Sequence, residues 1–323
     1  MIFIDQHILE QIVQRVRAGD KLLHAEALVG GVSAQVALLE VQHADGGTRK
    51  YLLRVHGERD RARNSDIAQH EFSLLKILHT AGLPVPQPHY LDISGEVYPI
   101  PYLMLDYLNG ATNFSPKNLT DFLQQSVELL AKIHQLKQNL AVEDSSTLDF
   151  LPDRVAHVLS QIGQIEQIDY QTELLDALGL GKLRDTLRTL FPLKQVNTPT
   201  LLHGDFWAGN LIWQEEKLVG IIDWENAELG DPLSDLSITR LDMLWAFGKD
   251  AMYDFTQAYQ TLMPHLDYGN LPAWDLFAAI RPGNQLGEWA ATWAGYGRSD
   301  VTLTTMRESQ LWFVKQAVEQ LTR

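Results

Sequence analysis

Residues 201–210 read Leu201-Leu-His-Gly-Asp205-Phe-Trp-Ala-Gly-Asn210 and are followed, twelve positions later, by Ile222-Asp223-Trp-Glu225. The apolar start of this stretch predicts a short buried segment that ends just before Asp205. Two β-rich runs, 211–213 and 218–222, are joined by a polar turn and predict a hairpin whose ends bring Asn210 near Asp223. We therefore expect Asp205 to orient or accept the proton of a substrate hydroxyl. Asn210 and Asp223 would offer oxygen ligands to a hard cation.

Neighbouring polar residues have less specific roles. His203 is interpreted as an anchor for the loop backbone rather than as a proton carrier. Glu225 is expected either to assist a metal or to face a cationic substrate. Asp235 is expected to mark the start of a helix or to brace a loop.

The remaining pattern divides the chain into a β-rich front and a helical back. The front has expected strands at 35–42, 51–55, 89–93 and 102–108, with helices at 5–18 and from Ser65 or Asp66 to about Thr80. Helical periodicity marks 119–138, two segments within 153–190, 234–247, 250–263, 272–295 and 302–321. This order predicts a two-lobed α+β fold with a cleft between lobes 1–106 and 107–323.

Two features of the front could contact phosphates. Gly30-Gly31-Val-Ser33 precedes an expected strand, where backbone can approach a phosphate closely; a plain turn is the alternative. Arg54 interrupts an apolar strand and Glu71 an apolar helix stripe, so the two charges are expected to pair. The pair would be either purely structural or an Arg that grips nucleotide phosphates and is aimed by Glu71.

The last front strand leads through Met104-Leu-Asp106-Tyr-Leu108-Asn-Gly110 into the helical part. Its backbone could offer hydrogen bonds to the edge of an adenine or guanine. A plain linker between the lobes is the alternative. Further along the chain, aromatic and acidic residues that could pack in the core or line an acceptor pocket are Trp245, Trp289, Trp293, Asp242 and Glu288.

Composition narrows the class of protein. The 323 residues fit two domains, and the net charge of -15 argues against nucleic acid as the main partner. The absence of cysteine excludes disulfides and thiolate metal sites. The first residues do not look like a signal peptide and no apolar run is long enough for a membrane span, so a cytoplasmic protein without a membrane partner is expected.

Taken together, these residues resemble the aminoglycoside phosphotransferase family, a branch of the protein-kinase-like fold. The match runs in order through Gly30-Gly31, Arg54, Glu71, Met104 to Gly110, Leu130-Ala-Lys-Ile-His134, His203 to Asn210 and Ile222 to Glu225, and covers roughly residues 25–240. The resemblance implies that Asp205 is the catalytic Asp, that Asn210 and Asp223 bind Mg2+ and that residues 104–108 form a nucleotide hinge. Arg54 departs from the Lys usual in protein kinases.

The resemblance implies transfer of the γ-phosphoryl group of ATP, or of GTP, to a hydroxyl of a small molecule. Within the family the acceptor is open, and an antibiotic-resistance kinase competes with a metabolite kinase of the choline, homoserine or sugar type. A nucleotide-binding regulator without catalysis is the alternative from another class. It is disfavoured because Asp205, Asn210 and Asp223 are all present.

Overall fold

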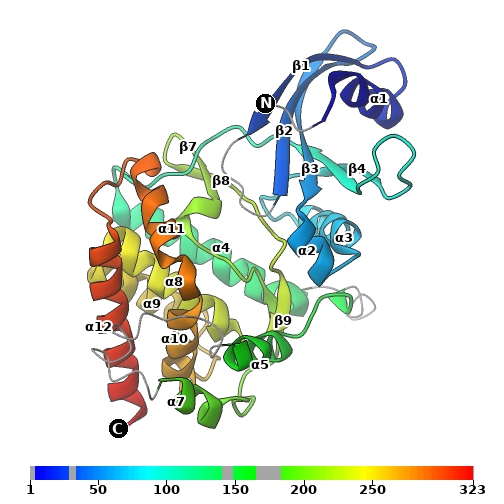
Figure 1. Cartoon of the computed structure of the whole chain (residues 1–323). Coiled ribbons are helices and arrows are strands. Elements are labelled where there is room, and N and C mark those ends of the chain that lie inside the picture. The colour runs from blue at the N-terminus through cyan, green and yellow to red at the C-terminus, as the bar shows by residue number, and fades with distance from the viewer. Residues whose placement is uncertain (1–3, 29–33, 140–147, 165–182, 323) are drawn as a thin grey trace. The chain divides into compact units, whose positions relative to one another are not determined.

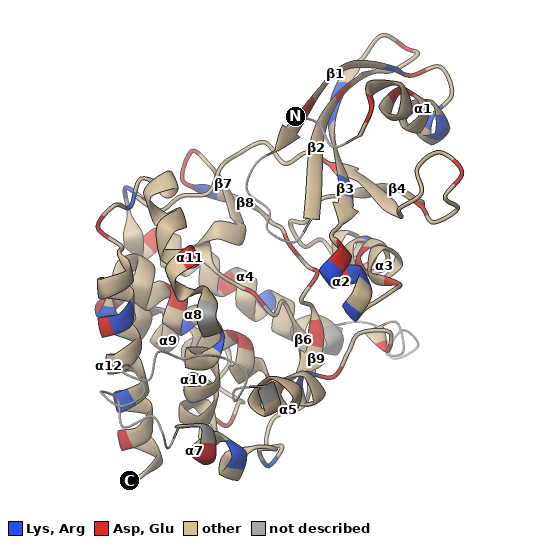
Figure 2. Cartoon of the chain, viewed as in Figure 1, with Lys and Arg blue, Asp and Glu red and all other residues tan. Residues whose placement is uncertain are grey.

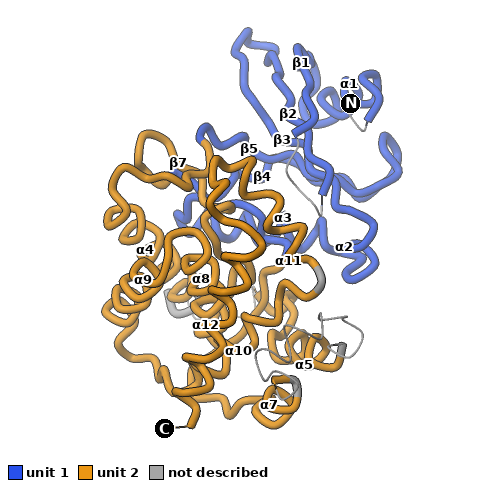
Figure 3. The backbone as a smooth tube through the Cα atoms, turned by 60° about the vertical axis from the view of Figure 1, so that its left-hand side comes forward, with its two compact units in different colours: residues 1–110, 219–225 blue, residues 111–218, 226–323 orange. Residues whose placement is uncertain are grey.

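The computed structural model describes residues 4–28, 34–139, 148–164 and 183–322, which form two compact units (Figure 3). Unit 1 comprises residues 1–110 and 219–225, and unit 2 comprises residues 111–218 and 226–323. The chain therefore returns to unit 1 for one short segment, which carries Asp223 and Glu225. The expected functional assignment of residues 1–106 to nucleotide binding and of 107–323 to catalysis and acceptor binding stays a prediction.

Unit 1 is built on an antiparallel sheet in the order β1-β2-β3-β5-β4 (Figure 1). The strands are β1 (Lys21–Leu28), β2 (Ala34–Gln42), β3 (Thr48–His56), β4 (Pro88–Asp92) and β5 (Tyr102–Asp106). The turn between β2 and β3 contains Gly46 at φ +90°, a conformation that glycine adopts without steric cost. Strand β1 was not expected, because as an exposed edge strand with the sequence KLLHAEAL it lacks a clear apolar alternation.

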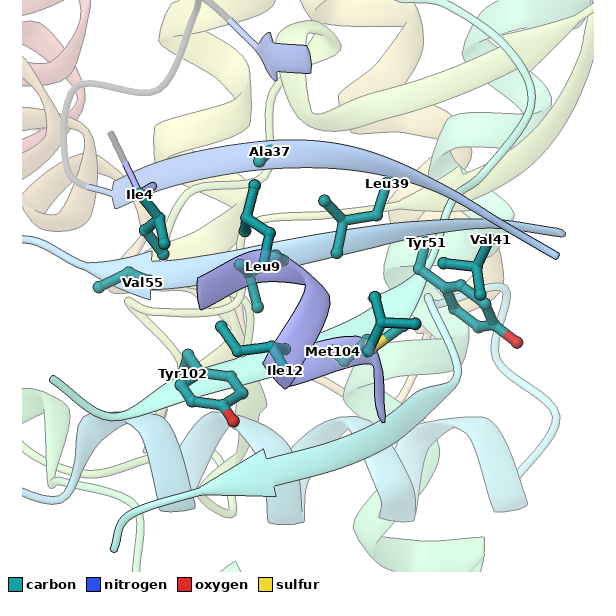
Figure 4. Close-up of a cluster of buried hydrophobic side chains, with 12 residues drawn as sticks. Ile4, Leu9, Ile12, Ala37, Leu39, Val41, Tyr51, Val55, Tyr102 and Met104 are labelled. Atoms are coloured by element: carbon teal, nitrogen blue, oxygen red, sulfur yellow. The ribbon is translucent and has the colours of Figure 1, made fainter. Parts of the chain in front are cut away.

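Three helices accompany this sheet: α1 (Gln6–Val16), α2 (Glu58–Arg63) and α3 (Ile67–Thr80). The side chain of Asp5 accepts a hydrogen bond from the backbone N–H of His7 and caps α1. Helix α1 buries Leu9 and Ile12 against apolar side chains of the sheet (Figure 4). Burying each of these side chains stabilises the fold by ~1.5–3 kcal/mol. Helix α2 was not expected, since its sequence ERDRAR is short and places acidic and basic residues together (Figure 2).

Alternation along β3 sends its side chains to the two faces of the sheet. Tyr51, Leu53 and Val55 belong to the apolar core against α1. Because successive strand residues point to opposite faces, Arg54 lies on the other face. There it meets Glu71, which comes from the buried side of α3.

Unit 2 is mainly helical. Its helices are α4 (Leu119–Asn139), α5 (Arg154–Gln164), α7 (Leu183–Leu190), α8 (Pro232–Phe247), α9 (Lys249–Leu262), α10 (Leu271–Ile280), α11 (Leu286–Thr292) and α12 (Leu303–Leu321). Short 3-10 turns lie at η4 (Ala208–Asn210), η5 (Gly283–Gln285) and η6 (Trp293–Tyr296). Strand β6 (Thr200–Leu202) pairs with β9 (Glu228–Gly230), and β7 (Leu211–Gln214) pairs with β8 (Lys217–Ile221), where the chain passes from unit 2 to unit 1.

Helix α8 lies at the centre of unit 2 and contacts α9, α10 and α12. Since it is buried all round, its charged residues need partners. Arg240 makes a two-pronged ion pair with Asp275 of α10, with both hydrogen bonds at 3.0 Å. Asp235 and Asp242, the two acidic residues of the same helix, also have partners. Both of those partners lie in or beside the loop that carries Asp205.

The single helical run expected over 272–295 is wrong. The structure ends α10 at Ile280 and resumes a regular helix only at Leu286. Pro282 explains the break, because proline lacks the N–H that would continue the helical hydrogen bonds. The interruption leaves Arg281 as the residue that caps α10. Among the described helices, none combines the length and apolarity needed to cross a membrane.

Candidate functional site

The loop that carries Asp205 is anchored by its flanking elements in unit 2. Strand β6 is fully buried and ends at Leu202, as the apolar start of the stretch predicted. Gly204 adopts φ +80°, and a Cβ at this position would clash with the main chain of Asn226. Only glycine fits here, so the loop turns at a defined point and Asp205 emerges partly exposed.

The carboxylate of Asp235, a residue of α8, accepts two backbone hydrogen bonds from this loop. Its Oδ2 accepts a hydrogen bond from the His203 N–H at 2.6 Å, and its Oδ1 accepts one from the Gly204 N–H at 2.9 Å. The Nε2 of His134 lies 3.3 Å from Oδ2 of the same carboxylate. Burial alone would raise the pKa of Asp235, but hydrogen bonding and charge from His134 lower it below its ordinary value. The expected loop-bracing role of Asp235 is confirmed.

Within the loop, His203 and Asn210 hold Asp205. The backbone N–H of Asp205 donates to Nδ1 of His203 at 3.3 Å, which agrees with the anchoring role expected for this buried histidine. The Nδ2 of Asn210 donates to the main-chain oxygen of Asp205 at 2.9 Å and to its Oδ2 at 3.1 Å. Both donor hydrogens of the Asn210 amide therefore point to Asp205, and its amide oxygen is the atom that suits a cation.

An arginine that sequence reasoning missed contacts the same carboxylate. Nη2 of Arg281 lies 2.5 Å from Oδ1 of Asp205, and Nη1 lies 3.5 Å from Oδ2 of Asp242. The arginine follows the apolar run Phe277-Ala-Ala-Ile280, where a charge calls for a buried partner. That signal was available in the sequence, but nothing there showed which carboxylate would meet it.

The carboxyl of Asp242 is unusual in its ionisation. Burial raises its pKa to about 7, the charge of Arg281 opposes this shift, and Asp205 adds to it. Close to neutral pH, Asp242 is therefore only partly ionised. Of the two carboxylates that contact Arg281, Asp205 is the closer.

This raised pKa predicts how stability depends on pH. Between its ordinary value of 3.8 and the folded value of about 7, the carboxyl of Asp242 ionises in the unfolded chain but not in the folded one. Its contribution to stability is therefore present below the unfolded pKa and is lost as pH rises to the folded pKa. Asp242→Asn removes this titration. As pH rises over this range, we expect the difference in free energy of unfolding between Asp242→Asn and the parent to shift in favour of the variant by up to ~4 kcal/mol. Urea unfolding at several pH values measures this difference. A difference that does not vary with pH would contradict this prediction.

In unit 1 a second charged cluster surrounds Arg54. Its Nε lies 3.1 Å from Glu71 Oε2, and its Nη2 lies 2.9 Å from Asp223 Oδ1 and 2.6 Å from Glu225 Oε2. His56 Nε2 is 2.7 Å from the same Glu71 oxygen. Burial alone would lower the pKa of Arg54, but the three carboxylates raise it above its ordinary value. The expected Arg54–Glu71 pair is therefore present, and Glu225 pairs with Arg54.

The segment that brings Asp223 into this cluster is fixed by backbone contacts within unit 1. The Ile221 N–H donates to the Pro84 carbonyl at 2.8 Å, and a Cβ at Gly220 would clash with Leu108. Asp223 itself adopts φ +69°, an uncommon conformation for a residue other than glycine. Such strain is found most often at functional sites, where the surroundings enforce it. Asn210 and Asp223 belong to different units, and their expected proximity stays a prediction.

The side chains of the expected hinge residues make different contacts, some in the apolar core and some with charged groups. Met104 buries its side chain in the core against α1, so that side chain is not available to a ligand. The carboxylate of Asp106 binds Arg49 at 2.9 Å and His89 at 2.7 Å, and its backbone N–H donates to Gln87. Leu108 lies against Gly220. Base recognition by this segment stays a prediction that concerns main-chain atoms.

The other expected residues divide into two groups. Gly30, Gly31 and Ser33 lie outside the described residues. Trp245 and Trp293 are buried in the core of unit 2. Trp289 is partly exposed, and its ring centroid lies 5.8 Å from the guanidinium carbon of Arg281. Trp289 therefore lies beside the guanidinium that contacts Asp205, while Trp293 packs against Trp207 of the Asp205 loop with ring centroids 6.2 Å apart.

Unit 2 thus carries a partly exposed carboxylate, Asp205, with an amide partner five residues on, and unit 1 carries an Asp-Trp-Glu segment paired with an inward arginine. Comparison with known protein families finds that residues 24–277 match the model of the phosphotransferase enzyme family, APH. The chain belongs to this family. Membership confirms the resemblance found in the sequence and the expected class of enzyme, a phosphotransferase.

Curated relatives match at low identity. A protein of Enterococcus faecium named as a probable ketoamine kinase is 25% identical over 272 residues, which are 81% of this chain and 89% of the relative. Acyl-CoA dehydrogenase family member 10 of Mus musculus is 28% identical over 184 residues, which are 54% of this chain and 16% of the relative. Human family member 11 is 25% identical over 209 residues, or 62% of this chain and 26% of the relative. The phosphotransferase chain thus matches about a quarter or less of these two dehydrogenase relatives.

Solved structures show the same fold. The GDP and kanamycin complex of APH(2'')-IIIa matches with a TM-score of 0.64 at 17% identity, over 98% of both chains. An amicoumacin kinase in complex with AMP-PNP and Ca2+ matches with a TM-score of 0.62 at 16% identity, over 94% of this chain and 93% of the other. The expected α+β, protein-kinase-like fold class of this phosphotransferase is confirmed.

Proposed function

We propose that this phosphotransferase moves the γ-phosphoryl group of ATP, or of GTP, to a hydroxyl of a small molecule. The main support for the proposal is the position of Asp205. The loop that contains it donates two backbone hydrogen bonds to the buried Asp235. A carboxylate held this firmly can orient an acceptor hydroxyl and take its proton as the phosphorus–oxygen bond forms. Phosphoryl transfer depends chiefly on such positioning and on neutralising phosphate charge.

The residues proposed for Mg2+ fit its chemistry. Three carboxylates surround the single guanidinium of Arg54, which leaves an excess of negative charge, and Asp223 is the most exposed of the three. Mg2+ prefers oxygen ligands and is usually held by one or two carboxylates together with phosphate oxygens and water. Such a site needs no cluster of three side-chain ligands, and among the described residues no group of three or more His, Asp or Glu side chains is placed so that it could hold a metal ion by itself. Asp223 and the Asn210 amide oxygen would hold the ion, which when bound neutralises phosphate charge.

Arg54 has a defined place in this proposal. Glu71 and Glu225 keep its guanidinium oriented, since both are buried and within 3.1 Å. If Asp223 turned to a bound cation, Nη2 of Arg54 would keep Glu225 as a partner and could offer its other N–H to a phosphate oxygen. Main-chain atoms of Asp106 and Leu108 would contact the base. Gly30, Gly31 and Ser33 would cover the phosphates.

Asp223→Ala is expected to weaken nucleotide binding in a magnesium-dependent way. The change removes the proposed charged ligand, so affinity for the nucleotide should fall ~10- to 100-fold in the presence of Mg2+. Without Mg2+ the loss should be much smaller. Calorimetric titration of ATP and GTP with and without Mg2+ measures both. Glu225→Gln is the matched control, because it also removes an Arg54 partner but not the proposed ligand. An equal loss with and without Mg2+ would argue against the assignment.

The function itself is tested by following labelled γ-phosphate across a panel of acceptors. The panel contains aminoglycosides, macrolides, choline, ethanolamine, homoserine, sugars and ketoamine sugars. Transfer to any hydroxyl acceptor that depends on Asp205 supports the proposal. The alternative, a nucleotide-binding regulator, predicts nucleotide binding without transfer and without any ATP hydrolysis sensitive to Asp205→Asn.

A further inference from the structure

His56 of unit 1 contacts the carboxylate that orients Arg54. It follows Arg54 by two positions on β3, and alternate residues of a strand point to the same face of a sheet. Its Nε2 lies 2.7 Å from Oε2 of Glu71, and Nε of Arg54 lies 3.1 Å from the same oxygen. One carboxylate oxygen of α3 is therefore shared by two nitrogen atoms from one strand.

The imidazole of His56 is placed where packing alone would favour an apolar side chain. The side chain is 0% exposed, and its Nδ1 has no hydrogen-bond partner among the described residues. A buried polar atom without a partner lowers stability. What the imidazole supplies is the contact with Glu71. Burial alone would raise the pKa of Glu71, but the charge of Arg54 and the contact with His56 lower it, so the carboxylate stays ionised at neutral pH.

The main chain of His56 is held on two sides. His56 pairs with Ala34 of β2 in the register of the sheet. Its carbonyl oxygen accepts a hydrogen bond from Nε of Arg61, a residue of α2, at 3.1 Å. The imidazole therefore approaches Glu71 from a fixed position, and it can restrain that carboxylate in turn.

We propose that His56 is a positioning residue for nucleotide phosphates, which restrains the carboxylate of Glu71 and through it the guanidinium of Arg54. This inference rests on the proposed function, in which Arg54 contacts a phosphate oxygen. Glu71 contacts the Nε side of the guanidinium, while Asp223 and Glu225 contact Nη2. Without His56, the described contacts of Glu71 would reduce to Arg54, and the two side chains could turn together. A guanidinium that is less well fixed offers a phosphate less affinity, because more of its freedom is lost on binding.

The first test compares two variants that differ in one N–H group. His56→Gln and His56→Met have side chains of similar length, but only Gln can donate a hydrogen bond to Glu71. We expect His56→Met to bind ATP about 3- to 10-fold more weakly than the parent in calorimetric titration with Mg2+, since the lost contact reaches the phosphates only through Glu71 and Arg54. His56→Gln should recover most of this loss. Adenosine, which lacks the phosphates, should bind the parent and both variants equally.

The second test asks whether the effect passes through Arg54. In an Arg54→Met background, His56→Met should not weaken ATP binding further. His43→Met is the matched control, because Nδ1 of His43 also lies 2.7 Å from a carboxylate oxygen, that of Asp20, in the same unit. His43 makes no described contact with Arg54 or Glu71, so this variant should keep the ratio of ATP to adenosine affinity of the parent.

The outcomes separate this inference from the proposed function. If His56→Met weakens ATP and adenosine binding equally, or weakens neither, His56 only fills the core and the inference is wrong. Additive losses in the double variant would also overturn it. If the parent binds ATP no more tightly than adenosine, or if Arg54→Met keeps full ATP affinity, the phosphate role of Arg54 in the proposed function fails as well. His56→Leu gives the same comparison where His56→Met does not fold.

Discussion

Asp205→Asn is expected to lower turnover ~100- to 10,000-fold while nucleotide affinity stays within a few-fold of the parent. The amide keeps the shape of the side chain and its main-chain contacts with Asn210 and His203. It cannot take the proton of an acceptor hydroxyl. It also loses the charge that pairs with Arg281. The variant therefore reports the effect of removing the carboxylate charge while the loop keeps its backbone contacts. Single-turnover transfer with saturating acceptor separates this chemical effect from substrate binding.

Two controls make this result specific. Asp250→Asn changes an exposed acidic residue in the first turn of α9 and should leave turnover unchanged. Urea unfolding of Asp205→Asn should show a loss of no more than a few kcal/mol, because its ion pair with Arg281 is partly exposed. Near-normal transfer by the variant would remove Asp205 from the catalytic role. A large loss of nucleotide affinity would instead indicate that Asp205 serves mainly in the nucleotide site.

The sequence predicted those parts of the candidate site that depend on local pattern. A buried apolar pair before His203 predicted the strand that delivers Asp205, and strand alternation predicted an inward Arg54. Opposite charges at inward positions predicted its pair with Glu71, because an unpaired buried charge is too costly. Each of these inferences needs only periodicity and the requirement that buried charges be compensated.

What the sequence did not predict depends on which distant segments meet. Arg281 lies 76 positions from Asp205. Helical periodicity predicts one continuous helix across this region, whereas α10 ends at Ile280 and Arg281 caps it. Glu225 was expected at a metal or a substrate, yet it binds the guanidinium of Arg54 from 171 positions away. Periodicity identifies an inward charge but not its partner when several carboxylates compete. The pairing is decided by tertiary packing.

The nucleotide half of the proposed site is built on residues recognised from the family pattern, whereas Arg281 and Trp289 lie beyond residue 240, where that pattern ended in the sequence. Within unit 2, Asp205 contacts both Asn210, which belongs to the family pattern, and Arg281, which lies beyond it. The backbone hydrogen bonds of this loop go to Asp235, so a change at Arg281 leaves them in place.

Asp235→Ala is expected to be more destabilising than any single change within the loop that Asp235 holds, and to abolish turnover. The substitution leaves the N–H groups of His203 and Gly204 without their buried acceptor and removes the partner of His134. Each unsatisfied buried group costs about 1–3 kcal/mol, so the sum reaches ~3–5 kcal/mol. That is a large fraction of the ~5–15 kcal/mol that stabilises a typical domain. Urea unfolding measures the loss, and hydrogen exchange at the two amides locates it.

Asp231→Ala is the matched control at the start of the same helix. Asp231 accepts a hydrogen bond from the Leu233 N–H at 3.0 Å, which caps α8, and another from Asn197 Nδ2 at 3.1 Å, so its loss should cost about 2 kcal/mol. It makes no described hydrogen bond to the loop of Asp205, and its turnover should stay close to that of the parent. If Asp235→Ala cost no more than Asp231→Ala, with normal exchange at His203 and Gly204, the loop would be held by other contacts. The proposal that Asp235 mounts the catalytic carboxylate would then be wrong.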